Sequence, residues 1–113
     1  MDEVTGDTCF ITLDKPQYII FYFTAGWCGP CKRIYLDLLE IIKKIDSEQI
    51  LMYKIDIDNE DNNEICEKCN ISSVPSFLLF KDRNFIDRVN GANREKLMDM
   101  INTKCINNIE KGN

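Results

Sequence analysis

One segment, YIIFYFTAGWCGPCK (residues 18–32), joins a continuous apolar run to two closely spaced cysteines. The run from Tyr18 to Phe23 is β-branched and aromatic, which is typical of a strand buried on both faces of a sheet. From Lys32 to Ile45 apolar residues recur at helical spacing and predict an amphipathic helix. We therefore expect Cys28 at a strand-to-helix junction with its sulfur open to solvent, where unpaired backbone N–H groups and the helix dipole stabilise a thiolate.

The sequence Cys28-Gly29-Pro30-Cys31 suits thiol–disulfide exchange. Thiols placed in this way have pKa values lowered from about 8.5 to roughly 3.5–7.5, so Cys28 is the predicted nucleophile. Cys31, one turn inside the helix, is placed to attack a mixed disulfide formed by Cys28. Pro30 suits the first helical turn because its missing N–H would have no partner there, and Gly29 keeps side-chain bulk away from the attacking sulfur.

The rest of the chain predicts a small α/β sandwich. Strands are expected over 50–57, 76–81 and 85–89, and the last two should pair as an antiparallel hairpin through Asp82-Arg83-Asn84. A short helix is expected over about 62–69, and Asn93 can cap a final helix. The apolar face of that final helix would hold Leu97, Met98, Ile101, Cys105 and Ile109. This order places the start of the cysteine-bearing helix at the C-terminal end of a central strand, the usual site position in such sheets.

Composition narrows the class of protein. The 113 residues suit one domain over 1–113, and 44% apolar residues suffice for a packed core. With 14 basic against 19 acidic residues the net charge is −5, which disfavours nucleic acid as a partner. No stretch has the length of a membrane span, and the acidic start, MDEVTGD (residues 1–7), is unlike a secretory signal. A monomer in the reducing cytoplasm is expected, or in an organelle if a targeting peptide was trimmed.

These motifs resemble those of the thioredoxin family. The stretch WCGPCK (residues 27–32) matches that family's active-site sequence, Val74-Pro75-Ser76 resembles its cis-proline signature, and Asn90-Gly91-Ala92 resembles its glycine turn. The resemblance runs from about Tyr18 to the last helix. It implies an α/β thioredoxin fold, with a central mixed β-sheet of four to five strands flanked by helices on both faces.

The resemblance also implies an activity, that of a protein-disulfide reductase serving electron transport and cell redox homeostasis through a redox-active Cys28–Cys31 pair. Its partners would be disulfide-containing proteins. No cofactor would be bound, and electrons would come from NADPH through thioredoxin reductase, or from glutathione. The substrate groove implied by the resemblance is formed by Trp27, Gly29, Pro30, Val74, Pro75 and Gly91.

Tyr22 departs from the family pattern, because it stands where the family carries a buried acid that helps to deprotonate the second cysteine. The chain has no His to replace that acid, so water, Asp56 or Asp58 is left as the base. Lys54 matches the family's buried lysine and would lose its carboxylate partner, which favours loss of its proton or a path to solvent.

Three further departures are structural. Leu36 stands where the family often has a kinking proline, which predicts a straighter helix. Arg83 replaces a hairpin glycine, so Asp82 or Asn84 is expected to take the strained turn position. The segment before Tyr18 is a few residues short of the family's first strand and helix, and it fits either a short helix or an edge strand.

Cys66 and Cys69 lie three residues apart on the short predicted helix. One interpretation is that they pack as small hydrophobes, and the sharper alternative is redox regulation through a second thiol pair or glutathionylation. Helical geometry disfavours a bond between them. Cys9 and Cys105 are expected to be core residues.

Three other functions compete with disulfide reduction. Both CxxC pairs together would supply four zinc ligands, although the segment between them is longer than common zinc spacings. A thioredoxin-like surface could serve as a partner-binding module with dispensable cysteines. A disulfide oxidase or isomerase would use the same thiols, but the Gly-Pro centre favours the reducing direction.

Overall fold

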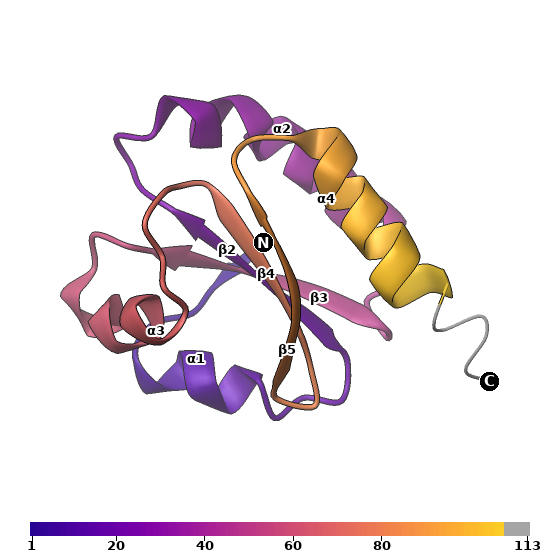
Figure 1. Cartoon of the computed structure of the whole chain (residues 1–113), viewed down its shortest axis with the longest axis horizontal. Coiled ribbons are helices and arrows are strands. Elements are labelled where there is room, and N and C mark those ends of the chain that lie inside the picture. The colour runs from indigo at the N-terminus through magenta and orange to yellow at the C-terminus, as the bar shows by residue number, and fades with distance from the viewer. Residues whose placement is uncertain (108–113) are drawn as a thin grey trace.

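The computed structural model describes residues 1–107, in which a five-stranded mixed sheet lies between two layers of helices (Figure 1). The strand order is β1-β3-β2-β4-β5. The strands are β1 (Asp2–Glu3), β2 (Tyr18–Thr24), β3 (Ile50–Asp56), β4 (Ser76–Lys81) and β5 (Asn84–Asn90). The helices are α1 (Asp7–Thr12), α2 (Gly29–Lys44), α3 (Asn63–Lys68) and α4 (Arg94–Met100), with a 3-10 turn η1 (Glu60–Asn62) before α3 and a π-helical segment η2 (Ile101–Ile106) after α4.

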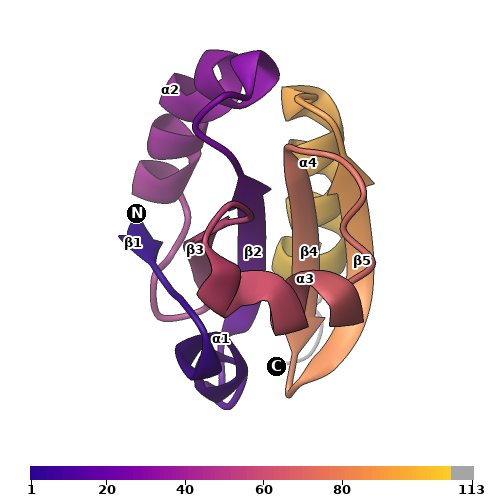
Figure 2. The same cartoon turned by 90° about the vertical axis from the view of Figure 1, so that its left-hand side faces the viewer.

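The central strand β2 separates two hydrophobic cores. Because side chains alternate along a strand, Ile20 and Tyr22 enter the core shared with α2 and α4, whereas Ile19, Phe21 and Phe23 enter the core shared with α1 and α3. Figures 1 and 2 show these helix pairs on opposite sides of the sheet. The prediction of a strand buried on both faces is therefore confirmed.

The directions of the strands bring three chain segments to one edge of the sheet. β2 runs parallel to β3 and antiparallel to β4, and β4 pairs antiparallel with β5. Phe23 near the end of β2 pairs with Ser76, which in turn pairs with Asn90. The residues just after β2, just before β4 and just after β5 are consequently neighbours.

The hairpin between β4 and β5 forms as predicted, but its turn differs from the prediction. Asp82 and Arg83 both have positive φ, 52° and 68°, whereas Asn84 is the first residue of β5. The expectation that Asp82 or Asn84 takes the strained position is met by Asp82, but Arg83 is strained as well, because a two-residue turn of this hand needs positive φ at both central residues. Arg83 is held there by contacts to Asp14 and to the carbonyl of Phe10.

The segments at the two ends of the described chain, before β2 and after β5, both contain helices. Asn93 caps α4, its Oδ1 accepting the N–H of Lys96 at 3.0 Å, as predicted. Ile109, assigned to that helix from the sequence, lies outside the described residues. Phe10 belongs to helix α1 and not to a strand, and the edge strand is the two-residue β1, which pairs in parallel with β3.

Candidate active site

Cys28 lies at the junction between β2 and α2, in the position expected from the sequence. It is the N-cap of α2 with extended backbone (φ −82°, ψ 107°), and its Sγ accepts the N–H of Cys31 at 3.1 Å. The two cysteines form a disulfide across a Cα–Cα distance of 5.3 Å. Because Sγ already receives a backbone N–H at the positive end of the helix, a negative charge on this atom is stabilised when the bond is reduced.

Burial of the two sulfur-bearing residues corrects one expectation. The sequence predicts an exposed Cys28 sulfur, but Cys28 is only 2% exposed and Cys31 only 3%. Both pack in the core cluster with Ala25, because the bond to Cys31 holds Cys28 against the start of α2. The neighbouring Trp27 is 67% exposed, in agreement with its predicted role as a surface residue.

Two loops complete the surroundings of the disulfide. The Val74–Pro75 peptide bond is cis, as the resemblance implies, and Gly91 has φ 99°, a conformation that favours glycine. The N–H of Gly91 donates to the carbonyl of Pro75 at 2.8 Å, which ties the two loops together. The structure thus brings Val74, Pro75 and Gly91 to the sheet edge at which α2 begins.

A buried hydroxyl that sequence reasoning did not single out fixes the cis-proline loop. Ser76 is fully buried, and its Oγ lies 2.8 Å from the carbonyl of Ser73 and 3.1 Å from Oδ1 of Asn90. Ser76 and Asn90 each stand in a motif noted in the sequence, but only the pairing of β4 with β5 shows that the two residues are in contact.

Tyr22 occupies the position of the family's buried acid and behaves as a structural residue. Its ring stacks on Phe77 with centroids 5.2 Å apart, and its hydroxyl lies 3.0 Å from Oγ1 of Thr24 and 3.4 Å from the carbonyl of Cys31. Burial raises the pKa of Tyr22, and the Thr24 hydrogen bond only partly opposes this. The hydroxyl therefore stays protonated near neutral pH and cannot act there as a base.

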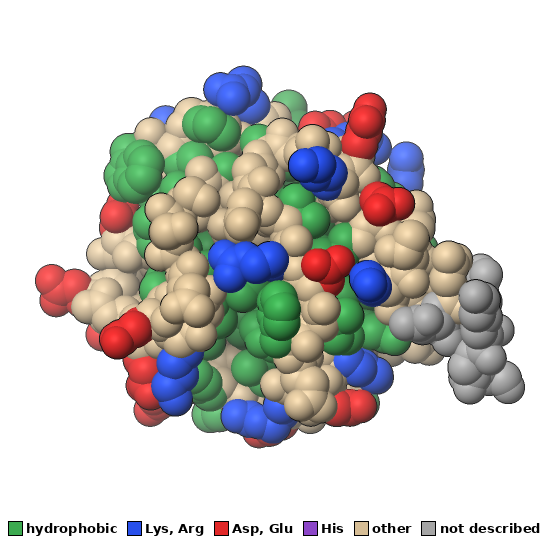
Figure 3. Space-filling view, in the orientation of Figure 1, with side chains coloured by type: hydrophobic (Ala, Val, Ile, Leu, Met, Phe, Trp, Pro, Cys, Tyr) green, Lys and Arg blue, Asp and Glu red, His purple; other side chains and the backbone are tan. Residues whose placement is uncertain are grey.

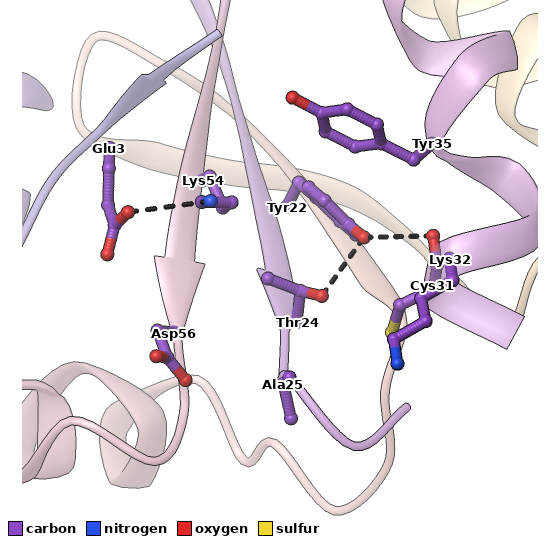
Figure 4. Close-up of a pocket in the computed structure, with 10 residues that line it drawn as sticks. Glu3, Tyr22, Thr24, Ala25, Cys31, Lys32, Tyr35, Lys54 and Asp56 are labelled. Carbon is purple, nitrogen blue, oxygen red and sulfur yellow. Dashed lines mark hydrogen bonds and ion pairs between the residues drawn. The ribbon is translucent and has the colours of Figure 1, made fainter. Parts of the chain in front are cut away.

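A hollow of about 210 Å³ lies beside Cys31 and Tyr22 (Figure 4). Lys54 lines it and pairs with Glu3 of β1 at 3.5 Å, so the prediction that Lys54 lacks a carboxylate partner is wrong. The replacement comes from the short parallel strand β1, which pairs with β3 at this point. Asp56 lines the same hollow, whereas Asp58 is not among its lining residues.

The remaining cysteines lie apart from this site. Cys9, Cys66 and Cys69 pack in the core of α1 and α3, on the opposite side of the sheet from Cys28. The two CxxC pairs therefore cannot share a metal ion, and within residues 1–107 no group of Cys, Asp and Glu side chains has metal-binding geometry. Cys105 is fully buried, as predicted, and burial raises its pKa to about 12.

The surface carries mixed charge. On the face of β5 and α4, acidic and basic side chains alternate without forming one basic area (Figure 3). Among the described residues there is no helix with the length and apolar character needed to span a membrane.

Comparison with known proteins identifies the family. The thioredoxin family profile matches residues 4–103. This chain belongs to the thioredoxin family. A thioredoxin from Ictalurus punctatus is 33% identical over 86 residues, which span 76% of this chain and 78% of that protein. A thioredoxin H-type from Fagopyrum esculentum is 32% identical over 88 residues, spanning 78% of this chain and 72% of that protein.

Solved structures agree with this assignment. Plasmodium falciparum thioredoxin superposes with a TM-score of 0.80 at 33% identity, over 90% of this chain and 97% of that one. The mitochondrial thioredoxin 3 of Saccharomyces cerevisiae, in its oxidised form, gives a TM-score of 0.80 at 28% identity. The match covers 90% of this chain and 93% of that one. The predicted thioredoxin fold is confirmed.

Family membership and the Cys28–Cys31 disulfide establish the activity. The protein is a thiol–disulfide oxidoreductase of the protein-disulfide reductase type. Thioredoxins need no bound cofactor for this reaction, and disulfide-containing proteins are their general class of substrate.

Proposed function

We propose that Cys28 and Cys31 carry the reaction in two steps. The Cys28 thiolate attacks a substrate disulfide, and one substrate sulfur leaves as a thiolate that takes up a proton. Cys31 then loses its proton and attacks Sγ of Cys28, which releases the second substrate thiol and leaves the Cys28–Cys31 disulfide. The position of Cys28 as N-cap of α2, with its Sγ accepting the N–H of Cys31, is the observation that carries this assignment.

We further propose that the substrate lies across the rim made by Trp27, the start of α2 and the two loops. The exposed indole of Trp27 offers an apolar platform, and the cis-Pro75 loop, tied to Gly91 through the Pro75 carbonyl, forms the rest of the rim. Gly29 and Pro30 add little bulk: a Cβ at Gly29 would meet only the Arg33 guanidinium at 3.8 Å. A flat rim of this kind fits an extended segment that bears a disulfide, and selects weakly among such segments.

Asp56 is the proposed base for Cys31, acting through water in the hollow. It shares this hollow with Cys31, and the other carboxylate there, Glu3, is already paired with Lys54. The expected result is that Asp56→Asn slows the second step about tenfold or more, because general base catalysis contributes at least that much. The measurement is decay of a pre-formed mixed disulfide on Cys28 by stopped flow, with Asp58→Asn as the matched control. Equal decay in both variants would remove Asp56 from the mechanism.

The source of electrons is proposed to be a thioredoxin reductase that uses NADPH, with glutathione as the alternative. We place the protein in the cytoplasm as a single-domain monomer over residues 1–113. The four free thiols Cys9, Cys66, Cys69 and Cys105 support a reducing compartment. One relative is a mitochondrial thioredoxin of Arabidopsis thaliana, so fluorescence microscopy of tagged full-length protein should compare cytoplasm and organelle.

Reduction of insulin disulfides by dithiothreitol tests the assignment of Cys28. Cys28→Ser should lower the protein-dependent rate at least about a thousandfold, as loss of a nucleophile does in other enzymes. The matched control, Cys66→Ser/Cys69→Ser, has the same CxxC spacing and should keep the parental rate. Full activity in Cys28→Ser would overturn the mechanism and favour a partner-binding module. A redox potential of about −120 mV for the Cys28–Cys31 pair, which is that of a strong disulfide-forming enzyme, would favour an oxidase.

A further inference from the structure

Three thiols gather on the side of the sheet that the proposed reaction does not use. Cys9 of α1 is fully buried, and Cys66 in α3 and Cys69 at its C-terminal end are half-buried against the same core cluster. All three are free thiols in this structure. Together with Cys105, which is buried in the other core, they are the thiols left without a role once the Cys28–Cys31 pair is assigned.

Contacts between α1 and the α3 segment place Cys9 beside Asn62, one turn before Cys66. Oδ1 of Asn62 accepts the N–H of Gly6 at 2.9 Å and lies 3.9 Å from Sγ of Cys9. Beyond Cys66, the Lys68 ammonium lies 5.3 Å from the centroid of the Phe10 ring. Cys66 is four residues after Asn62 and therefore lies on the same side of the helical segment, between these two contacts.

Electrostatics agree with this placement. Burial, with smaller contributions from negative charge on Cys66 and on Cys69, raises the pKa of Cys9 to about 11. A charge has this effect only when the two sulfurs are close in a poorly solvated region. The contact of Cys9 with Asn62, one turn before Cys66, selects Cys66 as its partner, and the electrostatic effect agrees with this choice.

We infer that Cys9 and Cys66 form a second disulfide site that joins α1 to the α3 segment when the protein meets a low-molecular-weight disulfide such as oxidised glutathione. In the first step the Cys66 thiolate attacks that disulfide, takes one glutathione and releases the other as a thiolate. Cys9 then loses its proton and attacks Sγ of Cys66, releasing the second glutathione. Two electrons pass to glutathione, whose two thiolates take up the protons lost from Cys9 and Cys66.

Cys66 and Cys69 do not form the bond, although they have the spacing of the active pair. Cys28 can reach Cys31 because it is an extended N-cap residue, whereas Cys66 lies inside α3. The helix end is held by the Cys69 N–H to Ile65 bond at 3.0 Å and by the Ile71 N–H to Cys66 bond at 3.0 Å. Joining Cys66 to Cys69 would require this end to unwind.

Peptide mapping of Cys28→Ser/Cys31→Ser after incubation with oxidised glutathione tests the inference without the active pair. Trypsin cuts after Lys68 and so separates Cys66 from Cys69, while Lys15 precedes Pro16 and leaves Cys9 within residues 1–32. The expected product is residues 1–32 linked to residues 55–68, with Cys69 free. A Cys66–Cys69 link, glutathione left on Cys66 beside a free Cys9, or unmodified thiols would each overturn the inference.

Single substitutions in the same background identify the partner. Cys66→Ser should lower the yield of the link between α1 and α3 at least about tenfold, because the attacking thiol is gone. Cys69→Ser is the matched control, equally half-buried, and should leave the yield unchanged. Loss of the link in Cys69→Ser with retention in Cys66→Ser would assign the bond to Cys69 and contradict the proposal. Since Cys28 is absent throughout, these outcomes are independent of the proposed reductase mechanism.

Discussion

Two CxxC pairs in this chain have the same spacing and opposite surroundings. Cys28 caps the N-terminus of α2, and its Sγ receives a backbone N–H, whereas Cys69 caps the C-terminus of α3, where the helix dipole is negative. The first pair is a disulfide and the second is two free thiols. The comparison shows that the spacing of cysteines allows a reaction, whereas the position of a thiol on its helix and its burial set how readily that thiol ionises.

The largest expected difference between the pairs is their rate of alkylation. Burial, together with the charge of Cys66, raises the pKa of Cys69 to about 11, so only about one part in ten thousand is thiolate at neutral pH. In the reduced protein Cys28 should react with iodoacetamide about a hundredfold faster, even though a more basic thiolate is intrinsically more nucleophilic. Isotope-coded labelling with mass spectrometry measures both rates.

The pH dependence of that labelling sharpens the contrast. The Cys69 rate should rise about tenfold per pH unit until the pH nears 11, while the Cys28 rate should be flat above neutral pH. In guanidinium the two rates should converge, because unfolding removes both the helix end and the burial. Similar rates in the folded protein would mean that the helix ends do not separate the pairs.

A smaller effect is expected on the free energy of unfolding at alkaline pH. Burial raises the folded-state pKa of Cys9 to about 11 and of Cys105 to about 12, above the unfolded value near 9. The native state therefore keeps protons that the unfolded chain loses, so the free energy of unfolding is intact below about pH 9 and falls as the pH rises toward 11. The loss is up to about 3 kcal/mol for each fully buried thiol.

Urea unfolding under a reducing agent at several alkaline pH values measures this decline. Cys105→Ala should make it shallower, because the titrating group is removed. Cys28→Ser should not make it shallower, because a helix N-terminal thiol has a lowered pKa and retains no proton in the native state that the unfolded chain loses. An unchanged slope in Cys105→Ala would show that burial of this thiol does not control alkaline stability.

The smallest expected effect concerns Tyr22, which belongs to the environment of the first pair only. Tyr22→Phe keeps the stacking on Phe77 but removes the hydroxyl contacts with Thr24 and the Cys31 carbonyl. The oxidised protein should lose about 1 kcal/mol, the usual net contribution of such a hydrogen bond. Denaturant unfolding measures the change, and Tyr18→Phe on the same strand is the control. A loss above about 3 kcal/mol would instead indicate a disturbed core.

Features that depend on neighbours in sequence could be predicted. The run from Tyr18 specifies strand β2, Asn93 caps α4, and a β-strand followed by Gly-Pro places Cys28 at a helix start. Each depends on backbone geometry within about one turn or a few residues, so the local pattern carries enough information.

Features that depend on distant segments could not be predicted. The Glu3 partner of Lys54 comes from β1 and the Asn90 partner of Ser76 from β5, and neither pairing has a local signal. The burial of Cys28 was missed for the same reason, because it follows from packing in the core that α2 shares with the sheet.

The amino-acid sequence alone determined the family, the fold and the pair of cysteines that exchanges electrons, since motif chemistry and hydrophobic periodicity are local properties of the chain. Only the tertiary structure decided how far each sulfur is buried and which thiols share the core between α1 and α3. The physical reason is that burial and thiol ionisation depend on atoms brought together by folding, and these atoms come from residues that are far apart along the chain.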